Sequence, residues 1–179
     1  MQDAVIFVGG FSHPPNVDAA AWLVREIMPL VWAQAPDVHL LLVGSAPPSE
    51  VQALAGPCVQ VTGFVPDIAP LYARSRMSVS PLRYGAGVKG KIVASLQAGV
   101  PVVTTAIGNE GLDLVPGAEA LVADTAPMLA AAILDLWRDP AMQDRLARAG
   151  QAVLRDRYSD AAARQALQSV LAAAAAARS

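Results

Sequence analysis

The stretch from residue 83 to residue 91 combines cations with glycines. The cations are Arg83, Lys89 and Lys91, and the glycines are Gly85, Gly87 and Gly90. Glycines let backbone N–H groups approach a phosphate closely, and the N-terminus of a following helix favours an anion. A lysine at that helix start is unfavourable unless an anion is bound, so Lys91 points to a diphosphate site. The alternative is that the three cations are simply solvated.

Apolar runs on both sides give this stretch its place in the fold. Residues 77–79 and 100–104 are typical of strands, and residues 91–98 have helical spacing that stops at Gly99. A strand, a glycine-rich turn, a helix and a second strand form a βαβ unit. We therefore expect the cations at the carboxyl end of a strand and in the first turn of a helix.

Strands and helices alternate along the whole chain. Apolar runs predict strands at residues 4–8, 38–43, 59–62, 77–79, 100–104 and 120–123. Such nearly continuous runs are typical of strands buried on both faces of a parallel sheet. The pattern predicts an α/β fold: a three-layer, doubly wound, Rossmann-like parallel sheet of about six strands. We expect one domain over residues 1–179, with extra C-terminal helices that must pack on the sheet or on something outside the chain.

Capping residues predict where the helices start. The candidate caps are Asn16, Ser49, Asp67, Asp124 or Thr125, Asp139 and Ser159. Pro29 should kink or break the first helix near its end. Residues 104–113 are rich in turn formers and predict a loop, and residues 172–177 are an alanine tail with high helix propensity.

The predicted topology brings two glycine-containing loops together. In a sheet of order 3-2-1-4-5-6, the first and fourth strands are neighbours, and ligands bind at their carboxyl ends. The loop after the first strand starts with Gly9 and Gly10, and the loop after the fourth is the stretch with the cations. The two loops should therefore face each other across one cleft.

Composition narrows the class of protein. The chain is 54% hydrophobic and 16% charged, which favours a sizeable core over disorder. No signal peptide or transmembrane run of about 18 apolar residues is present in the sequence. The single cysteine, Cys58, excludes an intramolecular disulfide and a multi-cysteine metal site, and the two histidines are not at ligand spacing. We expect no metal, no cofactor and, at a net charge of −2 without a basic block, no nucleic-acid partner.

The glycines also match the dinucleotide pattern G-x-G-x-x-G, from Gly85 to Gly90. That pattern normally occupies the turn after the first strand, with an acidic residue about 20 positions further on. Here it follows the fourth strand, so a nicotinamide or flavin site is the weaker interpretation. A glycine-rich turn without a ligand is the other alternative.

Several motifs together resemble a known family. They are Phe7-Val8-Gly9, Pro15-Asn16-x-Asp18, Leu42-Val43-Gly44, Gly63-Phe64-Val65, the run from Arg83 to Lys91, Ala98-Gly99-x-Pro101 and Glu110-Gly111-Leu112. Their order and spacing resemble the carboxy-terminal, donor-binding half of GT-B glycosyltransferases of family 4 (group 1). The resemblance covers nearly the whole chain. It implies that the amino-terminal, acceptor-binding half is absent, and the start of the chain close to a core strand favours an excised half.

The resemblance implies roles for individual residues. The base of a nucleotide sugar would lie at Phe64 and Val65, largely on backbone contacts. The diphosphate would lie between the turn of Gly9 and Gly10 and the loop that contains Gly87, Val88, Lys89 and Gly90. Lys91, together with Arg83, would replace phosphate-binding cations that many members carry after the first strand. No catalytic residue is assigned.

Two departures from the family concern carboxylates. The family often carries two glutamates, one touching the donor sugar and one holding the ribose. The corresponding positions are Ala86 and Ala94, whose side chains accept no hydrogen bond. Losing one such bond should weaken binding by roughly 1.5–3 kcal/mol.

The resemblance implies a bacterial, cytoplasmic glycosyltransferase of the hexosyltransferase type. It would transfer a sugar from a nucleoside-diphosphate sugar to an acceptor with retention, and the isolated half would be inactive. Contact with the inner membrane would run through the missing domain. One alternative is a degenerate, non-catalytic domain that acts as a partner or scaffold. Another is a sugar-nucleotide epimerase of the related two-domain type.

Overall fold

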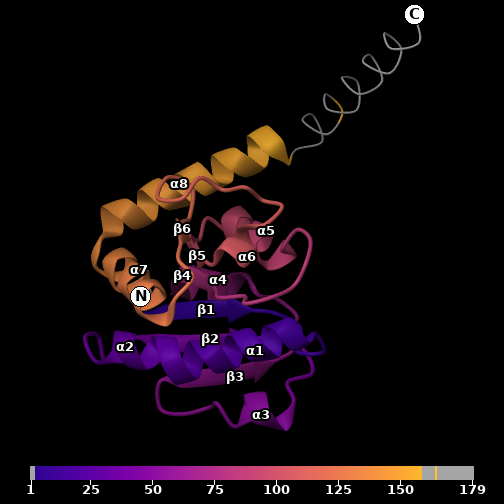
Figure 1. Ribbon diagram of the computed structural model, residues 1–179, viewed down its shortest axis with the longest axis vertical. Helices are drawn as coiled ribbons and strands as arrows, with labels where there is room; N and C mark the ends of the chain where they lie inside the picture. Colours follow the sequence, from indigo (N-terminus) through magenta and orange to yellow (C-terminus); the bar gives the residue numbers. More distant parts are fainter. Residues whose placement is uncertain (1–2, 159–163, 165–179) are drawn as a thin grey trace, which may run out of the picture.

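The fold is a single parallel sheet between two layers of helices (Figure 1). The computed structural model describes residues 3–158 and residue 164. In this part of the chain, the strands are β1 Ala4–Val8, β2 His39–Val43, β3 Val59–Gly63, β4 Ser75–Ser80, β5 Val102–Thr104 and β6 Leu121–Val122. They pair in the order β3-β2-β1-β4-β5-β6, and every pairing is parallel. The predicted doubly wound topology is confirmed.

Helices cover both faces of this sheet. They are α1 Pro14–Trp22, the π-helix η1 Leu23–Ile27, α2 Met28–Trp32, α3 Ser49–Gln52, α4 Ala69–Arg74, α5 Gly90–Gln97, α6 Ala106–Asn109, α7 Ala126–Arg138 and α8 Pro140–Arg157. Alternate residues of β1 enter different cores: Val5 and Phe7 pack with α1, α2 and α7, whereas Ala4 and Ile6 pack with α4. This two-sided burial explains the continuous apolar run of the strand.

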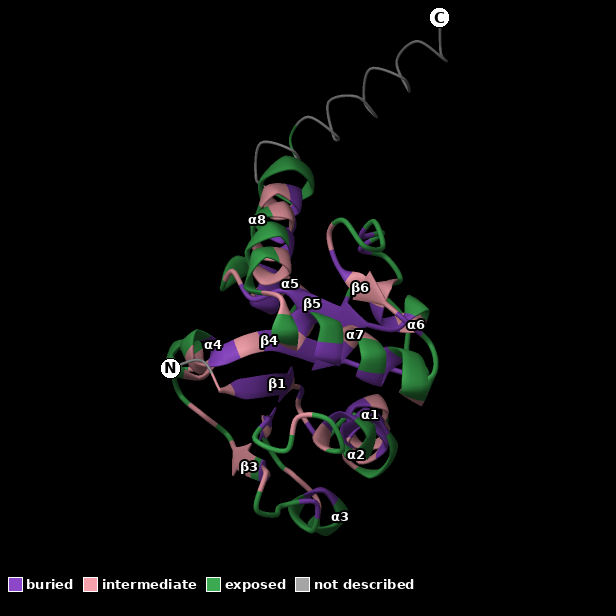
Figure 2. Cartoon of the chain, turned by 90° about the vertical axis from the view of Figure 1, so that its left-hand side faces the viewer, coloured by how far each residue is buried: buried purple, intermediate pink, exposed green. Residues whose placement is uncertain are grey.

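The last described helices pack within the domain, α7 on β4 and β5 and α8 on α5 and α7. The sequence leaves open whether these helices pack on the sheet or on something outside the chain. Helix α7 lies on the same face as α1 and α2, whereas α8 contributes Leu146 to that core and Val153 to the core around α5 on the other face. Figure 2 shows the buried side of α8 turned towards α5. The two helices approach closely at Gly150, where a Cβ would lie 2.4 Å from Leu96 Cδ2.

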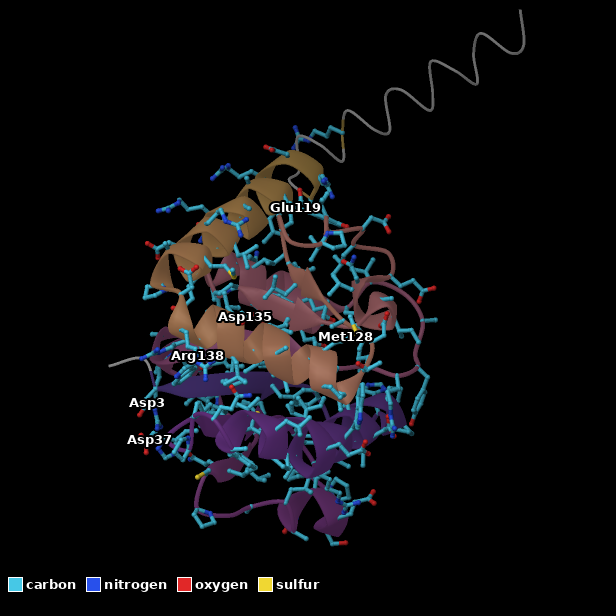
Figure 3. The ribbon with its side chains drawn as sticks, turned by 60° about the vertical axis from the view of Figure 1, so that its left-hand side comes forward. Asp3, Asp37, Glu119, Met128, Asp135 and Arg138 are labelled. Carbon is cyan, nitrogen blue, oxygen red and sulfur yellow. The ribbon has the colours of Figure 1, made fainter. Side chains whose placement is uncertain are left out.

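The direction of the strands sets the two edges of the sheet. Figure 3 shows both ends of α7, with Met128 at its start and Arg138 at its end near Asp3 and Asp37. Because Asp3 precedes β1 and α7 follows β6, Arg138 marks the amino-terminal edge and Met128 the carboxyl edge. The predicted site residues after β1, β3 and β4 lie at the carboxyl edge. No helix among the described residues is long and apolar enough to span a bilayer.

Three of the predicted helix caps are wrong. Helix α1 starts at Pro14 with His13 as its N-cap, so Asn16 lies inside the first turn. Helix α3 follows Pro48, and Ser49 does not cap it. By contrast, Thr125 and Asp139 cap α7 and α8 through hydrogen bonds from the amides of residues 128 and 142. Asp67 accepts from the amide of residue 69, but the N-cap of α4 is Ile68 and not Asp67.

Two other local predictions need correction or completion. Pro29 does not break the first helix, because η1 precedes it and gives the chain an extra residue per turn, so helical structure continues into α2. The predicted loop at 104–113 contains the short helix α6, capped by Thr105. The predicted cap Ser159 and the alanine tail lie outside the described residues.

Candidate functional site

The turn after β1 and the loop after β4 lie against each other at the carboxyl edge of the sheet. The Lys91 ammonium, in the first turn of α5, donates a hydrogen bond to Asn16 Oδ1 in α1. A Cβ on Gly85 would lie 3.6 Å from Pro15 Cγ. These contacts confirm that the two loops meet at the switch point between the neighbouring strands β1 and β4.

The turns after β1 and β2 are packed too closely for a side chain at Gly9 or at Gly44. A Cβ on Gly9 would lie 2.8 Å from Asn16 Cγ. A Cβ on Gly44, in the turn after β2, would lie 1.8 Å from the carbonyl oxygen of Gly9. The Gly9 amide also donates to Val43 O at 2.9 Å. Gly9 and Gly10 are therefore held in one position by the neighbouring turn and by α1.

The loop after β4 is braced from inside by Lys89. Its ammonium donates to Gly87 O at 2.5 Å and to Gly85 O at 3.4 Å, and the side chain is 7% exposed. The exposed carboxylate of Glu110 lies 3.9 Å from Lys89 Nζ. The alternative of a solvated Lys89 is wrong, because the side chain is buried and its ammonium donates hydrogen bonds to carbonyl groups of its own loop.

The first turn of α5 offers backbone donors. The helix follows Lys89 without a side-chain cap, and the amides of Ile92 and Val93 donate to Lys89 O. Within the described part of the chain, the amides of Gly90 and Lys91 have no hydrogen-bond acceptor. The space beside Gly90 is open, since a Cβ there would meet nothing within 4 Å. Free amides at an accessible helix start are suited to an anion.

Lys91 carries a charge that the protein does not neutralise. Its ammonium lies 5.1 Å from the centre of the Phe7 ring and bonds to the neutral amide of Asn16. Burial, and secondarily the positive charge of Lys89, lower the pKa of Lys91 to about 8. In the folded chain, Lys91 is thus a partly buried cation whose charged form is disfavoured by burial and by the nearby charge of Lys89.

This lowered pKa predicts a dependence of stability on pH. A lysine with a folded pKa of about 8 and an unfolded value of 10.5 destabilises the fold fully below pH 8 and progressively less above it. The stability advantage of a Lys91→Met variant over the wild type should therefore shrink as the pH rises from 7 to 10. Urea unfolding of both chains at pH 7, 8.5 and 10 measures this difference. A constant difference across that range would contradict the burial of the charge.

Arg83 is already paired on the side of α1. Its guanidinium donates to Asp18, with 2.9 Å from Nε to Oδ2, and lies 5.2 Å from the centre of the Trp22 ring. Its charge is therefore largely balanced before a ligand binds. A role of Arg83 in donor binding remains a prediction.

The segment after β3 presents an open surface at the same edge. Gly63 has a φ of +70°, which favours glycine, and its carbonyl accepts from the Gly44 amide at 3.2 Å. Phe64 is 73% exposed, whereas Val65 packs against the core under β1 and β2. Val88, in the loop after β4, is also exposed. Phe64 and Val88 are thus free to contact a ligand or another domain.

The two alanines at the glutamate positions have different surroundings. Ala86 is exposed in the loop after β4. Ala94 lies in the second turn of α5, half-buried against the core of Ile6 and Tyr72. Among the described residues of this region, the exposed side chain of Glu110 is a carboxylate, and it lies next to the ammonium of Lys89. No group of three or more metal-ligating side chains occurs among the described residues.

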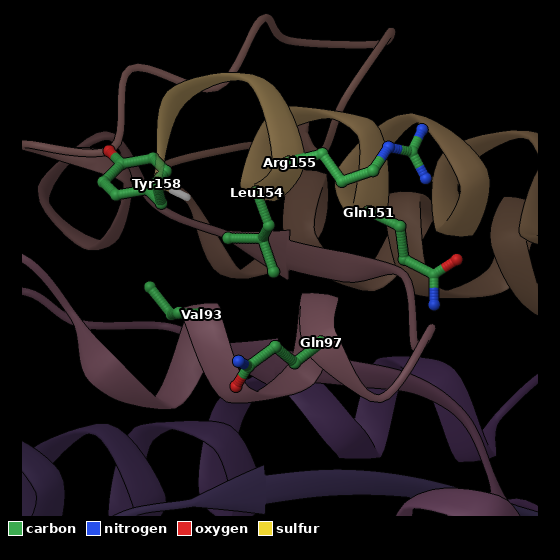
Figure 4. Close-up of a pocket in the computed structure, with 6 residues that line it drawn as sticks. All are labelled: Val93, Gln97, Gln151, Leu154, Arg155 and Tyr158. Atoms are coloured by element: carbon green, nitrogen blue, oxygen red, sulfur yellow. The ribbon is translucent and has the colours of Figure 1, made fainter. Parts of the chain in front are cut away.

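A separate groove lies between α5 and α8 (Figure 4). It is lined by Val93, Gln97, Gln151, Leu154, Arg155 and Tyr158. None of the residues predicted for the site lines this groove. The groove is therefore separate from the candidate site at the carboxyl edge, whose sequence-predicted residues come from the turns after β1, β3 and β4.

Comparisons with known proteins show which family the chain belongs to. The model of the family "Glycosyl transferases group 1" matches residues 2–139. An uncharacterised 44.6 kDa protein of the cps region of Klebsiella pneumoniae is 26% identical in an alignment of 140 residues that covers 73% of this chain and 36% of that protein.

Solved structures show the same fold. A sucrose-phosphate synthase from Thermosynechococcus elongatus matches with a TM-score of 0.75 and 26% identity, over 98% of this chain and 46% of that one. HepE from Anabaena, solved with UDP and glucose, matches with a TM-score of 0.75 and 19% identity, over 96% of this chain and 48% of that one. The chain thus spans about a third to a half of the length of these proteins. It belongs to the group 1 glycosyl transferases, with the fold of the C-terminal domain of their GT-B architecture.

Proposed function

We propose that this chain is the donor-binding domain of a glycosyltransferase and binds the diphosphate of a nucleotide sugar. The observation that carries the proposal is the unneutralised Lys91 beside the free amides of α5, facing the turn after β1. Helix amides and a cation together stabilise a phosphate that leaves as the sugar is transferred. The UDP bound to HepE, a protein of the same fold, makes UDP the first ligand to test.

In the proposed reaction, the bond between the sugar C1 and the diphosphate oxygen breaks. Negative charge then accumulates on the leaving nucleoside diphosphate, where Lys91 and the amides of Gly90 and Lys91 stabilise it. The base lies at Phe64 and Val65. A hydroxyl oxygen of the acceptor forms the new bond to C1 with retention, and its proton passes to the leaving diphosphate. The acceptor is bound by a second domain in the intact protein. We propose that the chain alone binds the donor but does not turn over, and that donor binding requires no metal or other cofactor.

A degenerate domain is the second candidate, and Ala86 and Ala94 favour it. Without carboxylates at these positions, the sugar and the ribose lose two hydrogen-bonding partners, each worth roughly 1.5–3 kcal/mol in comparable sites. Such a domain would keep the fold and serve as a partner or scaffold. The two candidates differ in whether the chain still binds a nucleotide.

Calorimetry with UDP, GDP and ADP separates these candidates. For a donor-binding domain, we expect one nucleotide to bind with a Kd of about 1 mM or lower, near −4 kcal/mol. The matching nucleoside without phosphates is the control and should bind at least about tenfold more weakly, because charge-assisted bonds to the diphosphate are lost. Absence of heat with all three nucleotides at millimolar concentration would refute donor binding by this chain.

A further inference from the structure

We propose that Asn16 is a positioning residue that holds the Lys91 ammonium between the turn after β1 and the start of α5. This inference rests on the proposed function, because the ammonium held there is the group that meets the diphosphate. The sequence suggested only a helix cap at this position. In the structure, the side chain of Asn16 instead connects the two loops of the site.

The Asn16 side chain uses both ends of its amide. Its Nδ2 donates to Gly10 O at 2.7 Å, and its Oδ1 accepts from Lys91. The residue is 8% exposed, and its backbone amide donates to His13 O at 3.0 Å, so α1 fixes it. The missing Cβ of Gly9 leaves the space that the amide occupies. Asn16 therefore fixes the turn and the cation relative to each other.

A neutral amide suits this position better than a carboxylate. An amide donates to a carbonyl group and accepts from an ammonium at the same time. A carboxylate would have no donor for Gly10 O, would neutralise Lys91 and would repel a diphosphate. The neighbouring pair shows the contrast, since Asp18 is a carboxylate and already balances the charge of Arg83. Asn16 thus leaves the charge of Lys91 for the ligand.

The other groups near the Lys91 ammonium do not neutralise it. Phe7 presents its ring from β1, and Lys89 adds a positive charge from the same loop. Glu110 pairs with Lys89 rather than with Lys91. A negative charge introduced at residue 16 would therefore be the closest counter-ion to Lys91, and its effect on the ammonium should be large.

The experiment uses the two lysines of the chain, Lys89 and Lys91, which give separate signals when lysine is labelled with ¹³C at the ε position. The pKa of Lys91 is measured by NMR without ligand, and UDP binding is measured by calorimetry at pH 7. In Asn16→Asp, we expect the pKa of Lys91 to rise towards the ordinary lysine value of about 10.4 and UDP binding to weaken at least about tenfold. In Asn16→Ala, the pKa should stay low while UDP binding weakens about fivefold, because only the positioning is lost.

Asn109→Asp is the matched control. The side chain of Asn109 also uses both ends of its amide, donating to Leu114 O and accepting from Leu114 N, but both of these bonds are made to Leu114 and not to Lys91. This variant should change neither the pKa of Lys91 nor UDP binding by more than about twofold. Comparable destabilisation of both aspartate variants would show that loss of stability alone does not explain the effect at residue 16.

The outcomes distinguish this inference from the proposed function. A wild-type chain that binds no nucleotide refutes the proposed function. A wild-type chain that binds UDP, with folded Asn16→Asp and Asn16→Ala variants that bind it equally well, refutes the role of Asn16. If Asn16→Asp does not fold, the Asn16→Ala result decides: weaker UDP binding at an unchanged Lys91 pKa supports the inference, and unchanged binding overturns it.

Discussion

Replacing Lys91 with methionine should weaken UDP binding by about 10- to 100-fold without lowering the stability of the fold. The loss of binding corresponds to about 1.5–3 kcal/mol, the usual contribution of a hydrogen bond to a charged group. Stability at pH 7 should be unchanged or higher by up to about 2 kcal/mol. The reason is that the folded chain partly buries the Lys91 charge beside Lys89, while methionine keeps the apolar stem. Calorimetry and urea unfolding measure the two effects.

Lys89→Met is the matched control for this substitution. It removes the other lysine of the chain, whose ammonium donates to Gly87 O and Gly85 O. Because these carbonyl groups lose their donor, we expect a loss of stability of about 1–3 kcal/mol. A Lys91→Met variant that is as strongly destabilised as Lys89→Met would show that Lys91 is a structural residue rather than a ligand-binding one.

Replacing Gly44 with alanine should destabilise the chain by about 3 kcal/mol or more and should abolish UDP binding. The new Cβ would lie 1.8 Å from the carbonyl oxygen of Gly9, so the backbone of one of the two turns must move. Backbone shifts forced by added atoms in packed regions cost about 1–3 kcal/mol, and sometimes more. The movement would displace the turn that faces Lys91. Thermal unfolding and calorimetry measure the two losses.

Gly56→Ala is the control for an added methyl group. Its Cβ would meet nothing within 4 Å, so the change should alter stability by no more than about 0.5 kcal/mol and leave UDP binding unchanged. If Gly44→Ala retained both wild-type stability and wild-type binding, the close approach of the two turns would be refuted.

Much of the fold follows from the sequence because the strands are buried on both faces. The run from Ala4 to Val8 is apolar throughout since its alternate side chains enter two different cores. Short helices are less predictable. Helix α6 has four residues and is stabilised by the Thr105 cap, whereas its sequence is typical of a loop. Pro29 is tolerated because a π-helical turn precedes it, which local propensity does not indicate.

The sequence predicts that the loops after β1 and β4 meet, but it does not predict the contacts that their side chains make. Lys89 and Lys91 are the same residue type, two positions apart, and both are bonded to Gly90 in the sequence. Only tertiary structure shows that Lys89 points into its own loop and that Lys91 points towards α1. The sequence predicts a cap at Asn16, because asparagine before a helical pattern usually is one. Its contact with Lys91 joins residues 75 positions apart, which no local pattern encodes.

A diphosphate site at the start of α5 is tested most directly by the pKa of Lys91 with and without UDP, read from the two ε-¹³C lysine signals. We expect a value of about 8 without ligand and a clear rise when UDP is bound, since a diphosphate stabilises the charged ammonium. Uridine should not produce this rise, and the Lys89 signal should change little. Binding of UDP that leaves the pKa of Lys91 unchanged would contradict a diphosphate site at the start of α5.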